Sequence, residues 1–189
     1  YRWVSPPPGA AKSNQSPLDR RAELPAVHDR LLATEVWTGD LQAVLALEEV
    51  GLRERPRTSV SVAITAVDPA ELAVPPEGQF PEGNAYRLDL DDGGTPIDRI
   101  DPAGRLILTV PHPAATVLFS RDGTRWTVLV AEPSDRDVTV GLERTGFYLA
   151  AADHAVGAGG RGPGGLTVGL LLVLPAVALA GLLLAKRRP

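Results

Sequence analysis

Ser59-Val60-Ser61-Val62-Ala63-Ile64-Thr65-Ala66 is the stretch that decides the fold class. Its larger apolar side chains recur at every second position, and small or polar residues stand between them. Successive side chains of a strand point to opposite faces, so this period predicts a strand with one buried and one exposed face. Half-buried strands of this kind are typical of antiparallel sheets.

The same period recurs on both sides of this stretch and predicts a series of short strands. Glycine and aspartate mark the connections, as in Asp91-Asp92-Gly93-Gly94, Asp101-Pro102-Ala103-Gly104 and Asp122-Gly123, where turns need positive φ or a local side-chain hydrogen bond. About nine antiparallel strands over residues 33–154 predict a mainly β fold, a two-layer β-sandwich ectodomain. The other strands are expected at residues 34–38, 41–47, 86–91, 105–110, 115–120, 125–131, 138–142 and 146–152.

The segments outside these strands carry weaker patterns. Asp68-Pro69-Ala70-Glu71 has Asp as N-cap, Pro at the first helical position and Glu at the third, which predicts one short helical turn. Residues 1–32 form a proline-rich lead segment, with a weak helical pattern over 17–32 that Pro25 interrupts. The lead is either a ligand for a proline-recognising module, or an ordered strap or tail, and we favour the strap or tail.

The order of these patterns resembles that of a known family. Thr34–Leu47, Ser59–Thr65, Arg105–His112 and Ser120–Trp126 together resemble immunoglobulin-like sandwiches of the type shared by zona-occludens proteins and netrin receptors. The whole chain is also similar to uncharacterised single-pass surface proteins of high-GC bacteria. The resemblance implies an architecture and an interaction role, and it carries over no catalytic residues.

Residues 166–185 contain no charged side chain, and sixteen of the twenty are Ala, Val or Leu. A helix needs about 20 apolar residues to cross a bilayer core roughly 30 Å thick, so this segment predicts one transmembrane helix, kinked at Pro175. The basic residues that follow predict a cytoplasmic tail at 186–189 and an extracellular N-terminal domain, joined to the helix by a glycine-rich linker at 155–165. The anchoring residues we name are Leu166, Leu170, Leu174, Pro175, Leu182, Lys186, Arg187 and Arg188.

This topology places the protein in the plasma membrane as a single-pass protein. An extracellular domain requires an export signal, and the 189-residue sequence contains no methionine, so we expect a cleaved signal peptide. The absence of cysteine excludes disulfides and thiolate metal sites. The net charge of −4 argues against nucleic acid as a partner.

The acidic residues offer one weak metal hypothesis. Asp89, Asp91 and Asp92 stand close together, and calcium prefers carboxylate oxygens. Their spacing does not match an EF-hand, and a polar strand face running into a turn explains them more simply. We therefore expect no metal and no cofactor.

Two further groups of residues are candidate sites. Ser120–Trp126 resembles an Asp-box hairpin that lacks one residue, in which Asp122 would cap the turn and Trp126 would anchor the returning strand in the core. Of the three histidines, His112 stands between two prolines and is expected to be exposed, and none has metal-ligand spacing. Motifs for a serine nucleophile or a phosphate-binding loop are missing, so we expect no enzyme.

These observations favour a non-enzymatic cell-surface protein that displays a β-sandwich for protein or ligand interaction. Its partner would be another surface or membrane protein, and the oligomeric state stays open. Two alternatives remain: a membrane-tethered carbohydrate-active or hydrolytic enzyme, whose carboxylates would come from distant strands, and a calcium-stiffened adhesion module.

Overall fold

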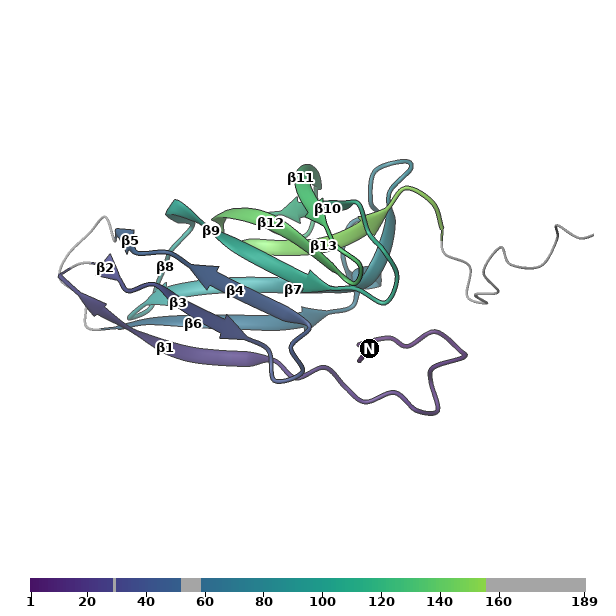
Figure 1. Cartoon of the computed structure of the whole chain (residues 1–189), viewed down its shortest axis with the longest axis horizontal. Helices are drawn as coiled ribbons and strands as arrows, with labels where there is room; N and C mark the ends of the chain where they lie inside the picture. Colours follow the sequence, from purple (N-terminus) through teal and green to yellow (C-terminus); the bar gives the residue numbers. More distant parts are fainter. Residues whose placement is uncertain (29, 52–58, 156–189) are drawn as a thin grey trace, which may run out of the picture. The chain divides into compact units, whose positions relative to one another are not determined.

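The computed structural model describes residues 1–28, 30–51 and 59–155 (Figure 1). Within them the chain is mainly β, with antiparallel strands and one short 3-10 helix, and no helix there is long and apolar enough to cross a membrane. The predicted helix at 166–185, the tail at 186–189 and the linker beyond residue 155 lie outside the described residues. The strands are β1 (Arg20–Val27), β2 (Arg30–Leu31), β3 (Thr34–Trp37), β4 (Ala43–Leu47), β5 (Val50–Gly51), β6 (Ser59–Val67), β7 (Phe80–Asp92), β8 (Thr95–Pro96), β9 (Arg99–Thr109), β10 (Thr116–Ser120), β11 (Thr127–Pro133), β12 (Asp137–Arg144) and β13 (Gly146–Ala152), and the helix is η1 (Pro69–Glu71).

Each of the predicted strands is present, and so is the predicted turn at Asp68, whose side chain caps η1. The turn predicted at Asp101-Pro102-Ala103-Gly104 is wrong, because these residues lie inside β9. Gly104 pairs with Leu142 of β12 there, and a Cβ atom on this glycine would lie only 2.8 Å from the carbonyl oxygen of Ala46. The glycine thus permits a close approach of two strands instead of a reversal.

The weak helical pattern over 17–32 is also wrong, because this part of the lead contains β1 and β2. β1 pairs with β6 along its length, and the pair Leu24 with Val60 places both side chains in the core. Pro25 is tolerated because β2 pairs with β1 only beyond it, so among the described strands the outer edge of β1 has no pairing neighbour at that point. Pairing with a distant strand outweighs the local helical preference.

The strands form one continuous antiparallel sheet in the order β3-β4-β9-β12-β11-β10-β13-β7-β6-β1-β2-β5, with β8 attached to β7. This sheet curls into a half-barrel, and β11 lies at the bend (Figure 1). We call β10-β13-β7-β6-β1 the first limb and β12-β9-β4-β3 the second limb.

The main core lies between the two limbs. Alternate residues of each strand point inward, as the period-two pattern requires, and residues of both limbs belong to one buried cluster. The inward-facing residues include Leu24, Val60, Val62, Ile64, Tyr86, Leu88, Leu90, Val117 and Tyr148 from the first limb, and Val36, Leu45, Leu47, Leu106, Leu108, Val138, Val140 and Leu142 from the second.

A second, smaller cluster covers the outer face of the first limb. Leu118 of β10 and Leu149 of β13 are buried there, and Leu72 after η1 and Trp126 pack against them. The indole Nε1 of Trp126 donates a hydrogen bond to the carbonyl oxygen of Ala73 at 2.6 Å. Trp126 therefore anchors its strand as expected, but in this outer cluster and not in the main core.

The first residues of the lead form an ordered strap, which two buried amide side chains hold. Asn84 of β7 donates to the carbonyl oxygen of Arg2 at 2.8 Å and accepts from the backbone N–H of Val4 at 2.9 Å. Gln42 donates to the same Arg2 carbonyl at 2.9 Å and accepts from the Arg2 N–H. Farther along, the Asn14 side chain makes a reciprocal pair of bonds with the Trp3 backbone. The strap is thus held through its main chain and through the Tyr1 hydroxyl, which accepts a 2.8 Å hydrogen bond from the backbone N–H of Asn84.

Candidate functional site

The sheet divides where β11 passes from one limb to the other. Residues 127–130 of β11 pair with β10 of the first limb, whereas residues 131–133 pair with β12 of the second limb. If the β11–β12 register continued, Val130 would face Gly141 and Thr127 would face Arg144, but no such pairs exist. Among the described strands, the edge of β11 at 127–130 and the edge of β12 at 141–144 therefore have no pairing neighbour on the sides that face each other.

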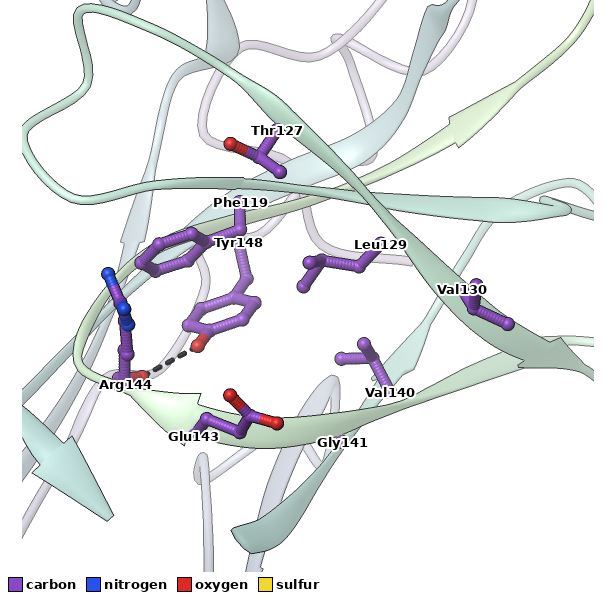
Figure 2. A pocket seen from close by; sticks show the side chains of 9 residues that line it. All are labelled: Phe119, Thr127, Leu129, Val130, Val140, Gly141, Glu143, Arg144 and Tyr148. Carbon is purple, nitrogen blue, oxygen red and sulfur yellow. Dashed lines mark hydrogen bonds between the residues drawn. The ribbon is translucent and has the colours of Figure 1, made fainter.

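A pocket of about 480 Å³ lies in this opening, and we call it the β11–β12 cleft. Figure 2 shows the rings of Phe119 and Tyr148 at one end of the cleft, and Val130 and Val140 at the other. A volume of this size falls in the range of ligand-binding pockets, roughly 300–1,000 Å³. The lining residues are Phe119, Thr127, Leu129, Val130, Val140, Gly141, Glu143, Arg144 and Tyr148.

Tyr148 forms the rigid floor of the aromatic end. Its side chain is 1% exposed, and its hydroxyl donates a 2.6 Å hydrogen bond to the carbonyl oxygen of Arg144 across the β12–β13 corner (Figure 2). Burial raises the pKa of the Tyr148 hydroxyl well above its usual value, so the phenol stays neutral. The ring of Phe119 packs against Tyr148 with centroids 5.1 Å apart. These two rings form a preset apolar wall.

Gly146 makes this wall possible. Its φ is +140°, and a Cβ atom there would lie 2.6 Å from the carbonyl oxygen of Ser120 and 3.0 Å from the Phe119 ring. Only glycine combines this backbone conformation with such a close approach of β13 to the end of β10. The corner between β12 and β13, which leads to Tyr148, therefore requires glycine at position 146.

The charged rim of the cleft comes from an irregularity in β12. The register between β12 and β9 shifts between Leu142 and Arg144, and such bulges redirect side chains. Both Glu143 and Arg144 are exposed and line the cleft on its β12 side (Figure 2). In the part of the chain that the structure describes, neither side chain has a hydrogen-bond or ion-pair partner.

A second hollow of about 370 Å³ adjoins the cleft and shares Phe119, Thr127 and Arg144 with it. Arg121 and Arg125 line this hollow too. Arg121 is paired with the Asp98 carboxylate, whereas the guanidinium of Arg125, like that of Arg144, has no hydrogen-bond or ion-pair partner among the described residues. The aromatic end of the cleft therefore carries one uncommitted positive charge, that of Arg144, and a second, that of Arg125, which acts on the Asp122 carboxylate.

The Asp122 turn beside this hollow matches the sequence interpretation. One Asp122 oxygen accepts hydrogen bonds from the backbone N–H and the hydroxyl of Thr124, at 2.9 Å and 2.7 Å. These bonds lower the pKa of Asp122 below its usual value. Asp122 thus stabilises a turn, and Thr124 occupies one of its carboxylate oxygens.

The three candidate calcium ligands, Asp89, Asp91 and Asp92, lie at the end of β7 that is joined to β8. Asp89 forms an ion pair with Arg87 at 2.8 Å, and one oxygen of Asp91 accepts from the Gly94 N–H at 2.6 Å. In residues 1–28, 30–51 and 59–155, no group of three histidine or acidic side chains is arranged to hold a metal ion. Asp91 instead supports the β7–β8 turn.

A buried acidic residue that the sequence did not single out lies at the opposite end of β7. The Glu82 side chain is 5% exposed and lies 3.0 Å from Nδ1 of His112, whose side chain is 48% exposed. Burial raises the pKa of Glu82, and the bond to His112 lowers it in part. His112 is therefore half-exposed, and it fastens the β9–β10 connection to β7.

No protein-family model matches the chain, and no curated protein matches its sequence. The β11–β12 cleft combines a pocket of ligand size, two unpaired strand edges and uncommitted charges of both signs, and these are the properties of a binding surface.

Proposed function

We propose that this chain is a membrane-anchored, non-enzymatic cell-surface protein whose β domain binds a partner at the β11–β12 cleft. In this proposal the domain is an extracellular β-sandwich that is exported by a cleaved signal peptide. The helix at 166–185 holds it in the plasma membrane, and residues 186–189 are cytoplasmic. The partner is another surface or membrane protein.

The single observation that carries the binding function is the unpaired opening of the sheet at β11. Unpaired strand edges invite another chain, and natural proteins usually cover, shorten or charge them. Here the two edges enclose an apolar pocket with an aromatic wall, and Val130 at its rim is 96% exposed. Open strand edges beside an exposed apolar pocket are unusual on a protein surface that binds nothing.

The architecture we propose is of the immunoglobulin-like type. The hydroxyl of Tyr148 bonds back to the main chain four residues earlier, at the corner between two strands. Immunoglobulin-like sandwiches use a tyrosine at a strand corner in the same way. This contact supports the resemblance seen in the sequence.

The enzyme alternative receives less support from the cleft. Glycoside hydrolysis needs two carboxyl groups that flank one bond, and the cleft lining contains one carboxylate, Glu143. The adhesion alternative needs a cluster of oxygen ligands, and the Asp91 oxygen that would serve it is bonded to a backbone N–H of its own turn.

The test is site-specific photocrosslinking on intact cells that produce the full chain. A photoreactive amino acid replaces Val130 at the cleft, and in a matched control it replaces Val74, which is 89% exposed but lies away from the cleft. We expect a discrete adduct from position 130 and none from position 74. Equal adducts from both positions, or none from position 130, would contradict the proposal. Protease added to the same cells should remove the domain, and full protection would contradict the topology.

A further inference from the structure

Resting on the proposed function, we infer that the ligand of the β11–β12 cleft is an extended peptide segment of the partner protein. The segment adds as a strand to the open edge of β12. It carries carboxylates at its N-terminal end, then one basic residue, and then a large apolar side chain opposite Gly141.

The backbone of the cleft indicates an extended peptide. Alternate N–H and C=O groups of an antiparallel strand point to each side, so an edge without a neighbour presents a row of donors and acceptors. Residues 141–144 present such an edge, and the β11–β12 register shows where a neighbouring strand would continue. A peptide main chain satisfies that row, as in other cases of strand addition.

The direction of the segment follows from the register. A strand that continues the line of β11 runs antiparallel to β12, so its first residues lie beside Arg144 and its later residues lie beside Gly141. Cross-strand neighbours share a face of the sheet. The side chains of the ligand, read from its N-terminus, therefore face Arg144 first, then Glu143, and Gly141 last.

The charges of the rim determine the first half of the ligand. Arg144 and Arg125 are exposed at the end where the segment begins. Glu143, the next residue of β12, is also exposed and lines the cleft. Opposite charges on directly facing strands stabilise pairing, and like charges destabilise it. The matching segment has acidic residues first and a basic residue opposite Glu143.

Gly141 determines the second half. A Cβ atom added to this glycine would meet no other atom within 4 Å, so the surface beside it is open. A large side chain on a neighbouring strand can cover such a glycine, as aromatic residues do in other sheets. Val130, which is 96% exposed, offers an apolar side chain of the cleft on this outward side, whereas Leu129 and Val140 face the core. We therefore place an aromatic residue of the ligand opposite Gly141.

The experiment measures fluorescence anisotropy with the purified full chain in detergent micelles. The probe is the labelled peptide acetyl-Asp-Asp-Lys-Val-Phe-amide, which ends opposite Gly141 because β11 already pairs with β12 from Val140 onward. Its matched control has the charges exchanged, acetyl-Lys-Lys-Asp-Val-Phe-amide. We expect the control to bind about tenfold more weakly, because each facing charge pair contributes a factor of a few. In the double variant Arg125→Gln with Arg144→Gln, the difference between the peptides should shrink to a few-fold. Equal affinity of the two peptides for the unaltered chain would overturn the charge assignment.

Two further comparisons test the mode of binding. N-methylation of the probe at alternate residues blocks backbone donors without changing the side chains, and we expect at least one of the two alternate sets to abolish binding. Undiminished binding by both methylated sets would overturn strand addition. Gly141→Leu should weaken binding about tenfold, because its side chain occupies the space of the ligand's aromatic residue. An unchanged melting temperature would show that this variant is folded, and unchanged binding by a folded variant would overturn the assigned position.

The outcome can be separated from that of the proposed function. If the Val130 crosslink forms on cells and neither peptide binds, the cleft has a partner of another kind and the peptide assignment is wrong. If no crosslink forms, the proposed function itself is wrong, whatever the peptides do.

Discussion

The change Asn84→Asp tests whether a buried amide holds the strap. It replaces the side-chain NH2 group by an oxygen atom and leaves the shape of the side chain almost unchanged. Asn84 is 2% exposed, and its Nδ2 lies 2.8 Å from the Arg2 carbonyl oxygen. After the change, a carboxylate oxygen faces that carbonyl with no proton between them. The Val4 bond to the other oxygen can remain.

The expected loss of stability follows from the burial of the Asn84 side chain and the Arg2 carbonyl oxygen. Losing the hydrogen bond costs about 1 kcal/mol, and leaving buried acceptors unsatisfied costs about 1–3 kcal/mol more. We therefore expect Asn84→Asp to lower the free energy of unfolding by about 2–4 kcal/mol at pH 7. Detachment of the strap limits this loss, because a released strap admits water to the new carboxylate. In that case the Val4 amide loses its protection from hydrogen exchange.

Asn14→Asp is the matched control. Asn14 makes the same pair of backbone bonds, with donor and acceptor distances to Trp3 of 2.9 Å, but it is only partly buried. Water can replace its lost bond, so we expect a loss of about 1 kcal/mol or less. Urea denaturation followed by tryptophan fluorescence measures both variants against the unaltered chain.

The pH dependence of the stability loss in Asn84→Asp tests this explanation further. Burial raises the pKa of the new carboxyl at position 84 above the unfolded value of about 3.9. Its destabilising effect is therefore present at pH 7 and decreases as the pH falls toward 4, where the protonated group can again donate to Arg2. Equal losses for Asn84→Asp and Asn14→Asp, or a loss that does not decrease at low pH, would refute the reasoning.

Three further predictions concern the corner of the cleft and the end of β7. Gly146→Ala should lower the free energy of unfolding by at least about 2 kcal/mol, because position 146 has a positive φ and its new Cβ atom would contact the Ser120 carbonyl oxygen. Gly141→Ala is the control and should change the free energy of unfolding by less than about 0.5 kcal/mol. Urea denaturation measures both variants, and similar losses would contradict this prediction. Tyr148→Phe should cost about 1–1.5 kcal/mol in the same assay, and an unchanged midpoint would show that its hydroxyl bond contributes nothing. Burial raises the pKa of Glu82 above its usual 4.5, so the folded chain loses stability as the pH rises from 4.5 toward neutral and this carboxyl group ionises. Glu82→Gln cannot ionise and should lose less stability than the unaltered chain over that interval. Parallel profiles of stability against pH would contradict the raised pKa of Glu82.

Local patterns predicted most of the sheet, because strands that bury one face reveal themselves by their period. The segment at 59–67 is an example: Val60, Val62 and Ile64 are all fully buried. β1 escaped prediction because its inward residues, among them Ala22 and Leu24, are small or widely spaced among charges, and its pairing with β6 is set by a strand far along the chain. β2, β5 and β8 are two residues long and carry no period at all.

The cleft could not be predicted in the same way. The pattern of β11 predicts a strand at 125–131, but it contains no sign that the strand changes neighbours between Val130 and Ala131. The partners of Glu82 and Asn84 are likewise far away in sequence, so neither residue stood out. Two local features of the sequence mark the site: Gly146 stands two residues before Tyr148, and Gly141 lies inside β12.

The most direct measurement of the central claim is amide hydrogen exchange of the full chain, resolved to single residues. The account predicts that alternate amides within 127–130 and 141–144 exchange rapidly, while those of β9 beside them are protected, and that the same amides become protected when the cleft is occupied. Uniform protection across β11 and β12 in the free chain would show that the sheet is not open there, and it would contradict the account.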